Sequence, residues 1–255
     1  MVGQQQHGHR KISLGSVSRR GYVVYLVESG DFDEGRALEE LFSSSGLPFY
    51  FERPLTRDDF LRCLSKNLKA AQTRLTEEGR LAGDEVPILH LSSHGWVSPR
   101  NGRPSPSSSW IVLADDEGIR WPEIREAISD LNDAFDGKLI LCVSTCHGIQ
   151  ADQIAMRTDR PDPPFHAMVA NSTSVDVGDC ERAFLAFYKS VLAGASLEEA
   201  VHEMRFASGN NNFVVHNGRE TTEPFNRLMA SIRDGELVEL RELYRQSWRQ
   251  LKTAR

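Results

Sequence analysis

Short apolar runs recur along the chain, and longer stretches with helical spacing lie between them. An unbroken apolar or β-branched run is typical of a strand in a parallel sheet, because helices cover both of its faces. The run Tyr22–Val27 is the clearest example. On this pattern we predict strands over residues 22–27, 48–51, 86–92, 138–144, 166–171 and 213–216.

The intervening stretches carry helix signals. Thr56 followed by Asp58 and Asp59 predicts the N-terminal cap and acidic first turn of a helix over about 57–80. Pro122 predicts the start of another helix, over 122–134. Further helices are expected over 33–45, 180–194, 197–207 and, in the charged tail, about 223–253. The alternation of strands and helices favours an α/β fold, a three-layer α/β/α sandwich around a mainly parallel six-stranded sheet.

Three segments of the central region interrupt this alternation. Residues 98–109 are rich in Pro and Ser and lack periodicity, which predicts a mobile loop. Residues 110–121, with an acidic turn in the middle, predict a small hairpin. Residues 147–165 form a second irregular segment that contains three prolines near its end.

The ends of the chain differ in character from its middle. Residues 1–20 are polar and are expected to form a disordered arm. Residues 21–216 carry the strands and predict one domain. Residues 217–255 predict a charged helical extension, which packs on the domain or binds a partner.

The composition indicates which partners and which cellular location to expect for the protein. The 255 residues are 40% apolar and carry a formal net charge of −6, so we expect no direct nucleic-acid binding. No apolar stretch approaches the roughly 18 residues that a membrane-spanning helix needs. The N-terminus lacks the apolar core of a signal peptide, and the four cysteines lack the dense spacing of secreted disulfide-rich domains. A reducing, cytoplasmic location is therefore expected.

Two short motifs stand where predicted strands end. Ser93-His94-Gly95 follows the run 87–91, and Thr145-Cys146-His147-Gly148 follows the run 138–143. Parallel α/β sheets hold their ligands at the carboxyl ends of their strands. A cysteine thiolate is a strong nucleophile, and a nearby imidazole can accept the thiol proton. The pair predicts a catalytic base, His94, and a nucleophile, Cys146.

Gly95 has a separate expected role. Attack on an amide creates an oxyanion, which backbone N–H groups stabilise at short range. Without a Cβ atom, Gly95 lets the backbone approach a substrate closely. We expect the N–H groups of Gly95 and Cys146 to form the oxyanion site.

The cysteines and histidines of this region also have other possible roles. A cysteine within a buried strand is commonly a small apolar core residue, which is the expected role of Cys142. Cys142 and Cys146 would lie about 13 Å apart on an extended strand, too far to share one zinc ion. Together with His147, His166 and Cys180 they are not expected to form a metal site, and no cofactor is expected.

The two motifs resemble those of caspase-type cysteine peptidases, the group that includes metacaspases, clostripain-like enzymes and bacterial CHAT peptidases. His94 precedes Cys146 by 52 positions, a separation similar to that of the group. The hairpin of residues 110–121 and the stretch 179–204 resemble CHAT proteins in particular. The resemblance covers about residues 21–216, and it implies the caspase fold and endopeptidase activity with a His94–Cys146 dyad.

The sequence departs from these families in the substrate pocket. Two positions before the nucleophile, caspases carry Gln and metacaspases Asp, whereas this chain has Ser144. Asp31 and Asp176, each just after a predicted strand, are candidates to bind a basic substrate side chain, or are simply solvated loop carboxylates. Arg36 would favour an acidic residue, but is expected on an exposed helix face.

The resulting hypothesis is a cysteine endopeptidase that cleaves protein substrates. An uncontrolled peptidase in the cytoplasm would be toxic, so we expect a regulatory protein partner, and the resemblance to CHAT peptidases implies a role in bacterial defence or regulated death. The irregular segments 98–109 and 147–165 flank the dyad. By resemblance to caspases, Arg157, Asp159 and Arg160 could mark a self-cleavage region, but they are more readily interpreted as part of a surface loop. The alternative is a catalytically silent caspase-like interaction module.

Overall fold

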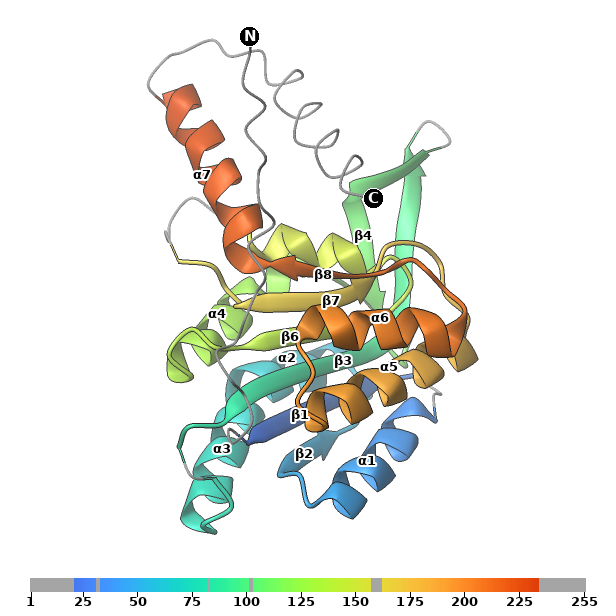
Figure 1. Ribbon diagram of the computed structural model, residues 1–255. Coiled ribbons are helices and arrows are strands. Elements are labelled where there is room, and N and C mark those ends of the chain that lie inside the picture. The colour runs from blue at the N-terminus through green and yellow to red at the C-terminus, as the bar shows by residue number, and fades with distance from the viewer. Residues whose placement is uncertain (1–20, 31–32, 82, 101–102, 157–161, 234–255) are drawn as a thin grey trace, which may run out of the picture.

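A central β-sheet with helices on both faces organises the computed structural model (Figure 1). The structure describes residues 21–30, 33–81, 83–100, 103–156 and 162–233. The predicted N-terminal arm and residues 234–255 of the charged tail lie outside these ranges.

Six strands form the main path of the sheet. The first five are mutually parallel, and only the last pairs antiparallel with its neighbour. The prediction of a mainly parallel six-stranded sheet is therefore confirmed. In spatial order the strands are β2 (Phe49–Glu52), β1 (Tyr22–Ser29), β3 (Val86–Arg100), β6 (Ile140–Ser144), β7 (Ala167–Asn171) and β8 (Phe213–Asn217).

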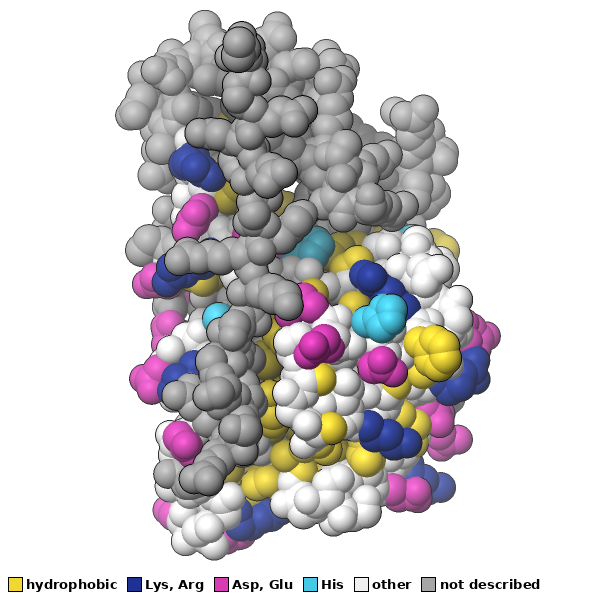
Figure 2. All heavy atoms as spheres, viewed as in Figure 1, with side chains coloured by type: hydrophobic (Ala, Val, Ile, Leu, Met, Phe, Trp, Pro, Cys, Tyr) yellow, Lys and Arg dark blue, Asp and Glu magenta, His cyan; other side chains and the backbone are white. Residues whose placement is uncertain are grey.

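Two separate apolar cores cover the two faces of the sheet, which makes the fold a three-layer α/β/α sandwich. One core contains Val24, Leu26 and Phe184, and belongs to the layer of α1 (Glu34–Ser45), α5 (Val177–Leu192) and α6 (Leu197–Ser208). Acidic and basic side chains are interspersed on the outer surface of this layer (Figure 2).

The opposite core packs against the remaining helices. Its members include Phe60 and Leu68 from one helical stretch and Trp121 and Ile128 from another. The first stretch consists of α2 (Arg57–Arg62), the π-helical turn η1 (Cys63–Asn67) and α3 (Leu68–Glu77). The second consists of the 3₁₀ turn η2 (Trp121–Ile124) and α4 (Arg125–Ala134). Thr56 caps α2 as predicted, with its hydroxyl accepting a hydrogen bond from the Asp59 N–H.

The prediction of a loop over residues 98–109 was wrong. β3 continues to Arg100, and β4 (Arg103–Val112) returns antiparallel to it before pairing with β5 (Gly118–Arg120). Pro99 lies opposite Pro104 in this ribbon. Every second N–H group in a two-stranded ribbon points away from its partner, so such a ribbon can contain prolines, and its register shifts between Val97 and Pro99. The β4–β5 pairing confirms the hairpin predicted over 110–121.

Two other segments are more ordered than the sequence predicted. Within 147–165, residues Gly148–Ile154 form the 3₁₀ helix η3. The helix of the charged tail, α7 (Gly218–Arg233), begins five residues before the expected start at 223 and contains Pro224 within its first turns. None of the described helices has the length and apolar character needed to cross a membrane.

Phe184→Ala tests the core beneath the candidate site. The Phe184 ring is fully buried and makes edge-on contacts with His90, Phe187 and Phe213. Because truncation removes apolar contacts and leaves a cavity, we expect the free energy of unfolding to fall by about 3–5 kcal/mol in a urea titration. Phe206→Ala, on the exposed side of α6 at 82% exposure, is the control and should change it by no more than about 0.5 kcal/mol. Equal losses in the two variants would contradict this packing.

Candidate active site

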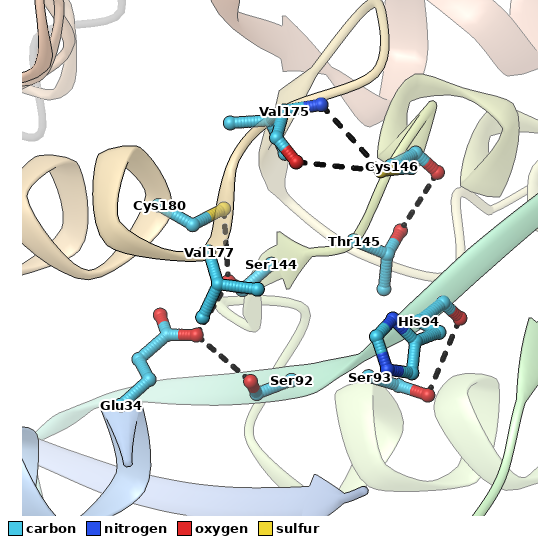
Figure 3. A pocket seen from close by; sticks show the side chains of 10 residues that line it. All are labelled: Glu34, Ser92, Ser93, His94, Ser144, Thr145, Cys146, Val175, Val177 and Cys180. Carbon is cyan, nitrogen blue, oxygen red and sulfur yellow. Dashed lines mark hydrogen bonds between the residues drawn. The ribbon is translucent and has the colours of Figure 1, made fainter. Parts of the chain in front are cut away.

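The pairing of β3 with β6 brings the two sequence motifs together. Ser92 is in register with Ser144, and His94 and Cys146 each follow two residues later, His94 where β3 turns to pair with β4 and Cys146 in the turn after β6. Neighbouring strands lie about 4.8 Å apart, so equal offsets place the two residues at the same edge of the sheet. Both line one small pocket that is open to solvent (Figure 3).

Cys146 is held by the backbone of the segment that follows β7. Its Sγ lies 3.5 Å from the Val175 N–H, which donates to it, and 3.6 Å from the Val175 carbonyl oxygen. The carbonyl can accept a hydrogen bond from the thiol, and the N–H can donate one to the thiolate. The same peptide segment therefore supports the sulfur in either protonation state.

His94 lies at the rim of the pocket, where β3 leaves the main sheet. From His94 onward β3 pairs with β4 instead, beginning at Val112. The preceding residue, Ser93, donates a 2.5 Å hydrogen bond from its hydroxyl to the Val112 carbonyl. The imidazole is exposed and is accessible to a substrate bound in the pocket.

Gly95 meets the backbone of Cys146 directly. A Cβ atom at this position would lie 2.0 Å from the Cys146 carbonyl oxygen and 3.0 Å from its nitrogen. In the structure, the backbone of Gly95 closely approaches the peptide of Cys146, whereas its expected approach to a substrate remains a prediction. The roles of the Gly95 and Cys146 N–H groups at an oxyanion remain predictions.

A tight turn follows the thiol. His147 adopts a left-handed conformation with φ of 56°, and its N–H donates a 2.7 Å hydrogen bond to the Thr173 carbonyl. Its Nε2 atom lies 3.2 Å from the Ser174 hydroxyl. These contacts join the turn to the segment 173–175 that holds the Cys146 sulfur.

The inner end of the pocket contains a carboxylate that the sequence did not single out. Glu34, in the first turn of α1, is 3% exposed and lines the pocket. Its Oε2 atom accepts hydrogen bonds from Ser92, at 2.8 Å, and from Ser144, at 2.7 Å. Acidic residues are common in the first turn of a helix, so nothing in the local sequence marked Glu34 as a pocket residue.

The three residues proposed to bind substrate have different locations. Ser144 lines the pocket as predicted, and its hydroxyl oxygen also lies 3.2 Å from Cys180 Sγ, whose thiol can donate to it. Asp176 instead caps α5 by accepting a hydrogen bond from the Gly178 N–H, and it does not line the pocket. Asp31 lies outside the described residues, and Arg36 is exposed on α1 as expected.

The other three cysteines are buried. Burial raises the pKa of the Cys63, Cys142 and Cys180 thiols. Cys142 is completely enclosed beside Tyr188, in agreement with its expected place in the core. Within the part of the chain that the structure describes, no group of three or more His, Cys, Asp or Glu side chains is placed to hold a metal ion.

No model of a known protein family matches the chain, and no curated protein matches it. The mostly parallel sheet between two helical layers is compatible with a caspase-like fold. The proposed kinship thus depends on the two motifs and on this architecture.

Gly95→Ala tests the contact between the motifs. The added methyl group overlaps the Cys146 carbonyl, which requires the backbone to shift. We expect a loss of about 1–3 kcal/mol in the free energy of unfolding, measured by urea titration. In the control Gly21→Ala the new methyl group lies 3.5 Å from Glu85 Cγ, an ordinary contact, and stability should stay within about 0.5 kcal/mol. A Gly95→Ala protein as stable as this control would contradict the geometry.

Native iodoacetamide labelling followed by mass spectrometry tests the cysteine environments. Because raised pKa values keep Cys63, Cys142 and Cys180 protonated at neutral pH, and burial shields them, the first label should attach to the partly exposed Cys146. All four cysteines should react once denaturant unfolds the chain. Early modification of any buried cysteine in the native protein would contradict this assignment.

Proposed function

We propose that the protein is a cysteine endopeptidase with Cys146 as nucleophile and His94 as general base and acid. The observation that supports this most strongly is the joint delivery of a thiol and an imidazole to one open pocket. Both come from equal offsets beyond the registered Ser92–Ser144 pair. Neither residue alone distinguishes a catalytic site from an ordinary turn, whereas their convergence provides the two groups that amide cleavage needs.

The chemistry follows from these groups. His94 takes the thiol proton, and the Cys146 sulfur forms a bond to the scissile carbonyl carbon, whose π electrons move to oxygen. The Gly95 and Cys146 N–H groups are the proposed donors to this oxyanion. When the oxyanion collapses, the C–N bond breaks and His94 gives its proton to the leaving amine. Water, deprotonated by His94, then releases the acyl group and restores the thiol.

Regulation by a protein partner and a role in bacterial defence or regulated death form the second part of the proposal, and they rest on the resemblance to CHAT peptidases. The proposed self-cleavage region includes Arg157, Asp159 and Arg160, which lie outside the described residues. It follows η3 directly, on the chain that leaves the nucleophile.

A thiol-alkylating peptide probe, applied with and without cell extract, tests the catalytic assignment. We expect covalent labelling of the wild-type protein, none of Cys146→Ala, and labelling of His94→Ala that is slower by about 100-fold or more, since a general base contributes roughly 10²–10⁴ in rate. His202→Ala, which removes an exposed histidine of α6, is the matched control and should react like the wild type. Labelling that persists in Cys146→Ala, or its absence under every condition, would favour the silent interaction module instead.

A further inference from the structure

The Glu34 carboxylate occupies the inner end of the pocket that contains Cys146. It is 3% exposed, and it enters from α1, a different element from those that carry the dyad. In Figure 3, Glu34 and Cys180 lie on one side of the pocket and Cys146 and His94 on the other. A group bound beside the thiol and extending inward would therefore approach this carboxylate.

The hydrogen bonds of Glu34 are unevenly divided between its two oxygens. Oε2 accepts from both Ser92 and Ser144, whereas Oε1 has no aligned hydrogen-bond donor among the described residues. The closest ring nitrogen is His90 Nε2, at 3.3 Å but poorly aligned for a hydrogen bond, and the other nitrogen of that ring contacts the Tyr188 hydroxyl at 3.0 Å. Since an ionised carboxylate offers about four acceptor positions, Glu34 retains capacity for further donors.

A second buried carboxylate nearby provides a comparison. Glu28, at the end of β1, forms an ion pair with Arg53 and accepts the Gly35 N–H at 2.5 Å. Among the described residues, Glu34 has no such lysine or arginine partner. A buried charge is costly unless a counter-charge compensates it. Glu28 thus has a permanent cation beside it, whereas Glu34 has only the His90 ring within ion-pair distance and lines a pocket.

The walls of the pocket suit one type of side chain. Val175, Val177 and Cys180 provide apolar surface, while the hydroxyls of Ser92 and Ser144 surround the carboxylate. Lysine and arginine combine an aliphatic stem with a cationic end, and so match this arrangement. An aspartate or glutamate would place a second negative charge beside Glu34.

We infer that Glu34 selects a basic residue, arginine or lysine, immediately before the scissile bond. Ser144 and Ser92 act as positioning residues, because their hydroxyls orient the carboxylate. Glu34 would thereby fill the role for which Asp31 and Asp176 were candidates in the sequence. The inference rests on the proposed peptidase function, since it names the substrate preference of that same site.

Matched peptide probes that differ only in the residue before the reactive group provide the test. Arginine and citrulline are nearly equal in shape, but citrulline carries no charge. On the wild-type protein we expect Cys146 labelling to be on the order of 10- to 100-fold faster with arginine than with citrulline, as for a hydrogen bond to a charged group. A lysine probe should also exceed a neutral one of similar length, and an aspartate probe should be the slowest.

Glu34→Gln keeps the side-chain shape and removes the charge. We expect the arginine rate to fall to the citrulline rate, while the citrulline rate stays within about threefold of its wild-type value, since neutral probes make no charged contact. A thermal unfolding scan reports whether the variant folds, and the wild-type arginine-to-citrulline ratio decides the inference if it does not.

The possible outcomes distinguish the proposed role of Glu34 from the proposed peptidase function. Equal labelling by arginine and citrulline probes, or faster labelling by neutral or acidic ones, would overturn the role of Glu34 and leave the peptidase proposal intact. Failure of every probe to label Cys146, with or without cell extract, would overturn the peptidase proposal and this inference with it.

Discussion

The contact between Gly95 and the peptide of Cys146 is the constraint on which the candidate site depends. No side chain fits between these two backbone segments, because a Cβ atom would stand 2.0 Å from the Cys146 carbonyl oxygen. The turn that presents the thiol can therefore lie directly against the strand that presents the imidazole. Val175 on the other side fixes the sulfur. The thiol is thus confined by backbone atoms, whose positions the sheet determines.

The sheet changes from apolar to polar along the face that meets α1 and α5. In β3 this face reads Ile88, His90 and Ser92, and in β6 it reads Ile140, Cys142 and Ser144. The apolar residues at the start of each strand stabilise the fold through burial. The polar residues at its end hold a carboxylate away from bulk water, where its interaction with a cation is strengthened by the low dielectric. In each of these strands, the first residues therefore stabilise the fold and the last residues line the pocket.

The sequence allowed much of the fold to be predicted, together with the position of His94 and Cys146 at one edge of the sheet, because each strand leaves a continuous apolar run and each motif follows one. Glu34 was missed for a physical reason. Its place in the pocket comes with contacts to Ser92 and Ser144, which are 58 and 110 positions away, and no local pattern records such contacts. The ribbon of β3 and β4 was missed because its prolines indicate a loop, unless the pairing partner on the other strand is known. The sequence left the role of Asp176 open, since an acidic residue after a strand is equally suited to cap the next helix, as it does here.

β3 belongs to two hydrogen-bonded ladders, and His94 stands at the junction between them. Up to Ser93 the strand is aligned by its parallel neighbours, and from His94 onward by β4. Side chains alternate between the faces of a strand, so a slip of one residue would turn His94 to the opposite side. The position of His94 thus depends on the number of residues between the two ladders of β3. Replacing a side chain in this stretch alters one contact, whereas inserting or deleting a single residue between 92 and 97 would shift every residue beyond it relative to one of the two ladders.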